Sequence, residues 1–348
     1  MSNNEHLLSA THTLKRGGTL TSSEISDAFR VIMGGNAPDG LIGAFLGILA
    51  TRVPEGKELF GAATVMKECA KCINLPDAPS LLDTCGTGGA PKTFNVSTAA
   101  GIVAAACGVR VAKHGNRSRT GRGSAEVLEQ LGVNIETTIE QQKLCLEDVG
   151  ICFCFAPNHH EAVAHVMPVR KSLGFPTIFN LLGPLTNPCS AGRQLLGVWD
   201  DVYVEPMAEA LLALGTTSSA VVHSSDGLDE VSISAPTRIM FVRDGSLVED
   251  HVKPEDVGLT CWDIKDVTAD SLSAATRFIN ESLLEGGSGG PRDMTVLNTA
   301  IALVLAGRAD TVSEGVTISC EAIDSGAARR KLQSWVEISN THTPSTNG

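Results

Sequence analysis

Residues 113–117 read Lys-His-Gly-Asn-Arg, which brings a cation, an imidazole, an amide and a guanidinium into one short segment. Such a combination is suited to holding an anion. The mostly apolar residues 109–112 before it are typical of the end of a buried strand. Because open α/β sheets bind ligands just beyond the carboxyl ends of their strands, the pattern predicts an anion-binding loop at such an end. A solvated surface loop with one stray histidine is the alternative.

A second candidate anion loop, Gly-Thr-Gly-Gly, occupies residues 86–89, between a predicted strand at 81–85 and a predicted helix at 99–107. Glycines let the backbone approach a phosphate closely, and the start of a helix favours negative charge. Asn95, Ser97 and Thr98 offer further hydrogen bonds at that helix start. A glycine run also suits an ordinary tight turn, so the prediction of a phosphate site depends on finding both loops on neighbouring strands.

Acidic residues follow a third apolar strand, predicted at 219–223. They are Asp226, Asp229 and Glu230. Beside two anion-binding loops these carboxylates would repel the same anion unless a cation lay between them. Mg²⁺ takes one or two carboxylates together with substrate phosphates, so the pattern indicates a magnesium site, with a plain acidic turn as the alternative.

Taken together, these motifs resemble the anthranilate phosphoribosyltransferase family, enzymes of tryptophan biosynthesis that join anthranilate to phosphoribosyl pyrophosphate. The resemblance covers nearly the whole chain, and residues 177–188, Thr-Ile-Phe-Asn-Leu-Leu-Gly-Pro-Leu-Thr-Asn-Pro, are its most specific part. It also includes residues 86–89, 95–98, 113–117, 159–160, 166–170, 226–230, 292–293, 298 and 321–326. The family fold is a small N-terminal helical domain followed by a larger α/β domain with a mainly parallel central sheet flanked by helices.

The resemblance implies roles for individual residues. The phosphoribosyl pyrophosphate site would comprise Gly86, Thr87, Gly88, Gly89, Ala90, Thr93, Asn95, Val96, Ser97, Thr98, Lys113, His114, Gly115, Asn116, Arg117, Ser118, Arg119, Thr120 and Ser124. The anthranilate site would comprise Gly86, His114, Asn116, Arg170 and Pro184. The ligands of Mg²⁺, two ions per monomer, would include Ser97, Asp229 and Glu230.

Two of these implications agree with simple chemistry. The guanidinium of Arg170 suits the carboxylate of anthranilate, although a surface arginine on a helix is the alternative. The aromatic amine is already neutral near pH 7, so displacement of pyrophosphate needs alignment and charge stabilisation rather than a strong base. No cysteine is paired with a base in the sequence, and we predict no covalent nucleophile.

The chain departs from the family pattern in two loops. Ala-Pro-Lys at residues 90–92 replaces the aspartate that usually follows the glycine loop, and Lys92 is a candidate for charge on the phosphates. Residues 118–124 are shorter and more basic than the usual serine-rich loop. Arg119 and Arg122 are therefore candidate phosphate ligands, with a mobile basic loop as the alternative.

The length of 348 residues favours two domains. We expect a helical domain at 1–76, with a capping box at residues 21–24 and with residues 165–190 packing back onto it. The α/β domain is expected at 77–164 and 191–339, with strands at 81–85, 109–112, 150–156 and 220–223 and a hairpin at 238–248 that turns at Asp244 and Gly245. Residues 340–348 are polar, and we expect a disordered tail there.

Composition and cysteine usage indicate a cytoplasmic enzyme. The net charge of −12 argues against nucleic acid or an anionic membrane as a partner. No secretion signal and no apolar stretch long enough to cross a membrane is recognisable. The ten cysteines lie in apolar or helical contexts, which is typical of buried thiols in a reducing compartment. The pair Cys69 and Cys72 and the group His159, His160 and His165 lack the partners of a metal site.

Two other functions share this architecture. A pyrimidine nucleoside phosphorylase should carry different signatures in place of residues 113–117 and 179–188. A nucleic-acid-binding paralogue without activity is disfavoured by the acidic pair Asp229 and Glu230 and by the negative charge. The resemblance implies a homodimer formed through the helical domain.

Overall fold

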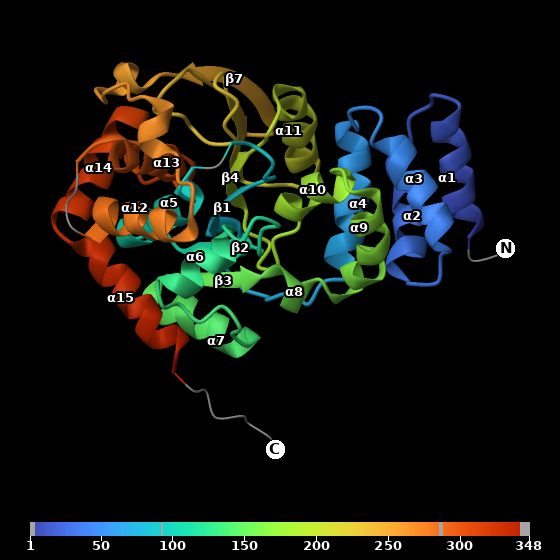
Figure 1. The fold of residues 1–348 in the computed structure, drawn as a ribbon, viewed down its shortest axis with the longest axis horizontal. Helices are drawn as coiled ribbons and strands as arrows, with labels where there is room; N and C mark the ends of the chain where they lie inside the picture. The colour runs from blue at the N-terminus through green and yellow to red at the C-terminus, as the bar shows by residue number, and fades with distance from the viewer. Residues whose placement is uncertain (1–3, 92, 285–287, 342–348) are drawn as a thin grey trace.

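The structure is a computed structural model and describes residues 4–91, 93–284 and 288–341. Four N-terminal helices lie together at one end of the molecule (Figure 1). The second of them begins with the predicted capping box, in which Thr21 Oγ1 accepts from the Glu24 amide and the Glu24 carboxylate accepts from the Thr21 amide. The helices are α1 (Glu5–Lys15), α2 (Ser22–Met33), α3 (Asp39–Leu49) and α4 (Gly56–Glu68).

A later segment of the chain returns to these helices, as Figure 1 shows for α9 and α10 beside α4. The rings of Phe29 in α2 and Phe179 in α10 lie 5.3 Å apart between centroids. Val169 and Ile178 belong to the same buried cluster. The short elements of this segment are α8 (Ala156–His159), η3 (Glu161–His165), α9 (Met167–Leu173), α10 (Ile178–Leu182) and η4 (Gly183–Leu185).

The rest of the chain is built on a seven-stranded sheet with strand order β3-β2-β1-β4-β5-β6-β7. The first five strands are parallel, and β6 and β7 form the predicted antiparallel hairpin, which turns at Asp244 and Gly245. The predicted mainly parallel sheet is therefore confirmed. The strands are β1 (Leu82–Gly86), β2 (Val111–Gly115), β3 (Ile151–Phe155), β4 (Arg193–Gly197), β5 (Ser218–Ser224), β6 (Thr237–Arg243) and β7 (Ser246–Val252).

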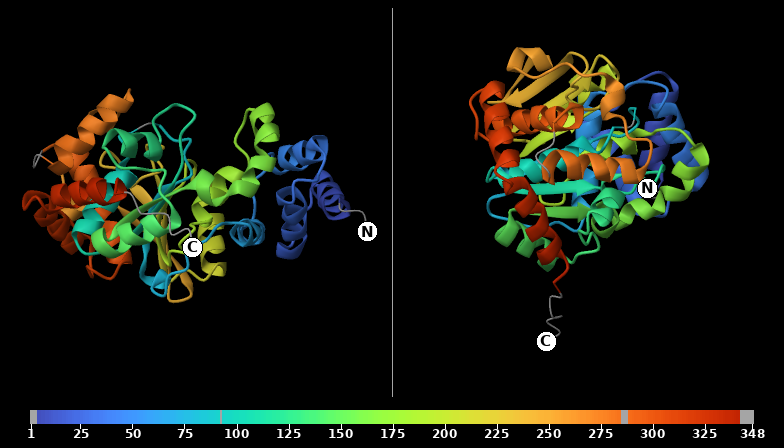
Figure 2. Two further views of the ribbon diagram at one scale, coloured as in Figure 1. Left: turned by 90° about the horizontal axis from the view of Figure 1, so that it is seen from below. Right: turned by 60° about the vertical axis from the view of Figure 1, so that its left-hand side comes forward.

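The sheet separates two hydrophobic cores, because successive side chains point to opposite faces. Leu195 and Val222 join the core formed with the C-terminal helices, whereas Leu196 and Val221 join the core shared with α11 and the N-terminal helices. Figure 2 shows from other directions that the C-terminal helices and the N-terminal helices lie on opposite sides of the sheet. The helices are α5 (Val96–Ala106), α6 (Ser124–Gln130), α7 (Ile139–Leu144), α11 (Val204–Ala213), α12 (Leu272–Leu284), α13 (Gly290–Leu305), α14 (Val312–Asp324) and α15 (Ala327–Ser339).

Two strand predictions need correction. Lys113 and His114 belong to β2, which continues to Gly115, so they are not in a loop. The polar residues concealed this strand, which is held by pairing with Phe153 and Cys154 of β3. Strand β4 was not predicted, because its short apolar run follows a segment rich in proline.

Two further points concern membranes and the tail. Among the described residues no helix is both long and apolar enough to cross a membrane. At the start of the predicted disordered tail, Asn340 Nδ2 donates to the Gly132 carbonyl at 2.9 Å. Residues 342–348 of that tail lie outside the described residues.

Candidate active site

The carboxyl ends of β1 and β4 lie side by side, with Gly86 paired to Gly197, and Asp229 packs against both. A Cβ on Gly197 would lie 1.6 Å from the Asp229 carbonyl oxygen, and one on Gly86 would lie 2.9 Å from Asp229 Oδ2. The Gly88 amide donates to the same Oδ2 at 3.2 Å. The absence of side chains at these glycines therefore lets the carboxylate contact the predicted phosphate loop.

Glu230 completes an acidic pair beside this loop. Thr93 Oγ1 donates to Glu230 Oε2 at 2.7 Å. Burial and then the charge of Asp229 raise the pKa of Glu230 to about 8. Two adjacent carboxyls that resist joint ionisation form a site that a divalent cation would neutralise. The donors are oxygens, as Mg²⁺ prefers, so these residues fit that ion.

Lys113 supplies a buried positive charge under the same edge of the sheet. Only 1% of its surface is exposed, and its Nζ donates to the Thr84 carbonyl at 2.5 Å and to Ser97 Oγ at 3.2 Å. Burial lowers the pKa of Lys113, whereas the nearby Asp83 acts in the opposite direction. Thr84 Oγ1 also donates to the Ser97 carbonyl at 2.7 Å. These contacts tie β1, β2 and the start of α5 together.

The start of α5 has no side-chain cap. Asn95 has a left-handed backbone (φ 65°), and its Nδ2 donates to the Arg122 carbonyl at 3.2 Å. Thr98 Oγ1 is buried and has no hydrogen-bond partner among the described residues. The Val96 amide instead faces the Glu230 carboxyl. The helix start therefore contacts the acidic pair directly.

The basic loop is mostly engaged in contacts within the protein. The Arg117 guanidinium forms two hydrogen bonds with the Glu129 carboxylate, at 2.6 and 2.7 Å. Arg122 donates to the Ala269 carbonyl. Arg119 is exposed and takes part in no ion pair among residues 4–91, 93–284 and 288–341. Lys92, the other candidate for contacts with phosphate, lies outside the described residues.

His114 and His160 form a neutral wall at the end of β2. Their rings lie 5.2 Å apart between centroids, and both side chains are buried. Burial, then the neighbouring histidines, lower the pKa of His114 well below its usual range, and burial followed by the proximity of His159 lowers the pKa of His160 to about 4. The Pro184 carbonyl, in the adjacent η4, accepts from Gln194 Nε2 at 2.6 Å. Two uncharged imidazoles suit an aromatic ring better than an anion.

Arg170 lies on α9, and its side chain contacts Phe179 and Met167 and not the phosphate loops. Its Cζ is 5.1 Å from the centroid of the Phe179 ring, and Nη1 lies 3.6 Å from Met167 Sδ. Burial lowers the pKa of Arg170, and in the described part of the chain it forms no ion pair. The structure thus presents a half-buried guanidinium whose charge is not neutralised by a described carboxylate.

Two residues that organise this site were not predicted. The buried carboxylate of Asp83 accepts from the His114 amide at 3.1 Å and from Asn187 Nδ2 at 2.9 Å. An acid inside the apolar run 81–85 was the signal in the sequence that could have identified it. Trp199 donates its amide to Thr87 Oγ1 at 3.2 Å, and its ring lies 3.4 Å from a Cβ built on Gly89. No pattern in the sequence indicated that contact.

We expect Gly86→Ala to weaken magnesium binding about tenfold, because the added methyl would displace the Asp229 carboxylate. Gly47→Ala is the matched control, since a Cβ there meets nothing within 4 Å. Isothermal titration calorimetry with Mg²⁺ in the presence of phosphoribosyl pyrophosphate measures the magnesium affinity of each variant. Equal affinities in the two variants would show that Asp229 does not set the metal site.

Known proteins are similar to this chain over nearly its whole length. Residues 8–70 match the helical bundle domain and residues 78–329 the a/b domain of the Glycosyl transferase family. The anthranilate phosphoribosyltransferase of Chromobacterium violaceum is 42% identical over 332 residues, which are 95% of this chain and 97% of the relative. That of Symbiobacterium thermophilum is 44% identical over 326 residues, 93% of this chain and 95% of the relative.

Solved structures agree with these matches. The crystal structure of anthranilate phosphoribosyltransferase from Thermus thermophilus is 36% identical, with a TM-score of 0.89 over 95% of this chain and 99% of that chain. The Saccharomyces cerevisiae enzyme in complex with PRPP and Mg is 27% identical, with a TM-score of 0.86 over 96% of this chain and 97% of that chain. The identities extend over both domains and nearly the full length of each relative. This chain therefore belongs to the anthranilate phosphoribosyltransferase family.

Proposed function

We propose that this chain transfers the phosphoribosyl group of phosphoribosyl pyrophosphate to the amine of anthranilate, releasing pyrophosphate, in tryptophan biosynthesis. The observation that carries the proposal is the contact of the glycine loop with Asp229 and of Thr93 with Glu230, close to the buried Lys113 that bonds Ser97. In a member of this family, such a combination of anion-binding backbone, carboxylates and cation suits a magnesium-bound pyrophosphate.

We place the substrates on the residues that the sequence predicted. Phosphoribosyl pyrophosphate would lie along residues 86–98 and 113–124, and two Mg²⁺ ions would be held by Ser97, Asp229, Glu230 and substrate oxygens. Anthranilate would lie between the imidazole of His114 and the guanidinium of Arg170. The helical domain would comprise residues 1–76 with 165–190, which the contact of Phe29 with Phe179 supports. The chain would act as a homodimer through that domain, in the cytoplasm.

The chemistry needs positioning more than proton transfer. The aromatic amine, neutral near pH 7, attacks C1 of the ribose while the bond to pyrophosphate breaks. The nitrogen then loses one proton to the departing pyrophosphate or to solvent. Neutral His114 and His160 place no competing charge beside the ring of anthranilate. Backbone amides of the glycine loop would hold the departing pyrophosphate, and the buried charge of Lys113 would stabilise it from within the sheet edge. Bound Mg²⁺ supplies further neutralisation of its charge.

The proposal is tested by following the loss of anthranilate fluorescence when purified protein is mixed with phosphoribosyl pyrophosphate, with and without Mg²⁺. We expect a loss that requires both substrates and the metal. Parallel assays measure phosphorolysis of pyrimidine nucleosides and gel shifts on DNA. Fluorescence that is unchanged at any magnesium concentration would refute the proposal, and activity in a parallel assay would then identify the alternative.

Magnesium binding should release protons, because the raised pKa of Glu230 leaves this carboxyl protonated before the metal binds. With its pKa near 8, Glu230 is mostly protonated at pH 7 and must ionise when it binds the metal. We therefore expect release of close to one proton per chain at pH 7, and an affinity that rises with pH up to about 8 and then levels off.

Calorimetric titrations in two buffers with different ionisation enthalpies measure this release. Glu230→Gln is the control. Any protons that phosphoribosyl pyrophosphate loses when Mg²⁺ binds are the same with both proteins, so they cancel when the two proton releases are subtracted. Identical release from wild type and variant would contradict the assignment of the titrating group to Glu230.

A further inference from the structure

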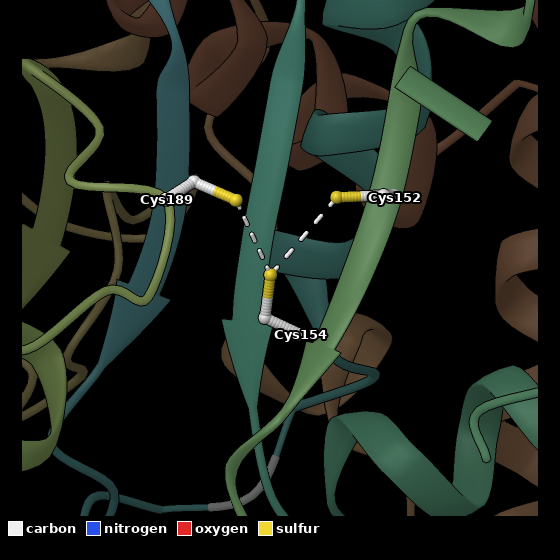
Figure 3. A group of neighbouring side chains, drawn as sticks. All are labelled: Cys152, Cys154 and Cys189. Atoms are coloured by element: carbon white, nitrogen blue, oxygen red, sulfur yellow. Dashed lines mark hydrogen bonds between the residues drawn. The ribbon is translucent and has the colours of Figure 1, made fainter. Parts of the chain in front are cut away.

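Three buried cysteines form a cluster behind the candidate active site. Cys152 and Cys154 are two residues apart on β3, so their side chains point to the same face of the sheet. Cys189 comes from the segment between η4 and β4. Figure 3 shows the three side chains pointing toward one another, with Cys154 Sγ 4.0 Å from Cys152 Sγ and 3.6 Å from Cys189 Sγ. All three sulfurs lie within 4.8 Å of one another.

These separations match those of thiolates around one metal ion. With metal–sulfur bonds of about 2.3 Å, two thiolates lie about 3.8 Å apart at a tetrahedral angle and about 4.0 Å apart in a trigonal plane. The two separations of 3.6 and 4.0 Å span this range, and the third is at most 4.8 Å. The sulfurs therefore need only small shifts to share an ion.

We propose that Cys152, Cys154 and Cys189 bind one soft, thiophilic metal ion of the class Cu⁺, Zn²⁺ and Cd²⁺ through three thiolates. The ligand set contains only sulfur, which selects soft ions over Mg²⁺. In the described residues no histidine, aspartate or glutamate joins this group. Both ring nitrogens of the nearby His159 are engaged, with the Lys71 carbonyl at 2.7 Å and with Gln142 Oε1 at 3.0 Å. The ion is therefore three-coordinate.

Binding exchanges protons for the metal ion. Each of the three thiols loses its proton when its sulfur binds the ion, and no electron is transferred.

The cluster lies at an edge strand, through which an ion could enter, and next to His114 of the candidate active site. β3 is at the edge of the sheet, so opening its single ladder with β2 exposes the sulfurs. Cys154 is paired in register with His114, and the Cys189 amide donates to Asn187 Oδ1 at 2.9 Å. The ion would therefore lie directly behind the wall of the candidate anthranilate site.

The test uses full-length protein in which the exposed Cys69 and Cys261 are replaced by serine, in excess Mg²⁺ to occupy the carboxylate site. Titration with Cd²⁺ should give one ion per chain, an ultraviolet sulfur-to-cadmium charge-transfer band, a ¹¹³Cd resonance typical of three sulfur ligands, and a higher Tm. Loss of an outer-shell partner already weakens metal binding about 10- to 100-fold, so Cys189→Ala should weaken it at least about 100-fold.

Cys145→Ala is the matched control, because Cys145 is a buried cysteine outside the cluster. It should bind Cd²⁺ as the parent protein does. If Cys189→Ala does not fold, Cys152→Ala serves in its place. Absence of the charge-transfer band, a resonance typical of fewer sulfurs, or equal affinities in cluster and control variants would overturn the proposal.

Discussion

Replacing Glu230 with glutamine should lower magnesium-dependent phosphoribosyl transfer by about 10²- to 10³-fold. The amide keeps the shape of the side chain and its hydrogen bond with Thr93 Oγ1, which lies 2.7 Å from the carboxyl. It cannot acquire the negative charge that the metal site needs. The loss should therefore persist at saturating substrate and be only partly relieved by more Mg²⁺. Initial rates measured across a magnesium series test this.

In the absence of Mg²⁺, the same substitution should make the stability of the folded protein less sensitive to rising pH. The pKa of Glu230 is higher in the folded than in the unfolded chain, so its favourable contribution is complete below about pH 4.5 and is lost as the pH rises through about 8. We therefore expect the Tm of wild type without Mg²⁺ to fall over this range, and that of Glu230→Gln to fall less.

Asp226→Asn is the matched control for charge, since Asp226 lies in the same turn but accepts from Ser232 Oγ at 2.6 Å. It should retain most of the activity. An inactive Glu230→Gln protein with a lower Tm at pH 8 would indicate a folding defect instead of a lost metal ligand.

The fold could be predicted largely because its signals are local. The capping box at Thr21 and the turn at Asp244 and Gly245 are each specified by a few adjacent residues, and the structure confirms them. Strand β4 has only a short apolar run, and what makes it a strand is pairing with β1 and β5. Such pairing depends on residues far away in the sequence, so the pattern alone could not reveal it.

The site could be predicted as a set of motifs but not as a set of contacts. Lys113 was predicted as a phosphate-binding cation in a loop, and that role stays a prediction. In the structure Lys113 lies in β2, and its charge is buried against Thr84 and Ser97. Asp83 was overlooked because a carboxylate in a strand gains its role only from Asn187 and His114 on other elements. A residue type indicates possible chemistry, whereas its direction depends on the packing of distant segments.

The second large effect should be seen with Arg170. A charged hydrogen-bonded pair contributes about 1.5 to 3 kcal/mol, so Arg170→Ala should raise the KM for anthranilate about 10- to 100-fold if the guanidinium binds its carboxylate. The KM for phosphoribosyl pyrophosphate should change little, because the contacts of Arg170 lie with Phe179 and Met167 and not with the phosphate loops. Steady-state rates with each substrate varied in turn measure the two effects.

Two further variants separate the role of charge from that of shape. Lys171→Ala removes an adjacent, exposed cation and should leave both KM values unchanged. Arg170→Lys keeps the charge but loses the planar fork and the stacking on Phe179, so it should restore only part of the affinity. If lysine restored it fully, a point charge would suffice. If alanine raised both KM values equally, Arg170 would act by holding α9 against α10, and another group would have to bind the carboxylate of anthranilate.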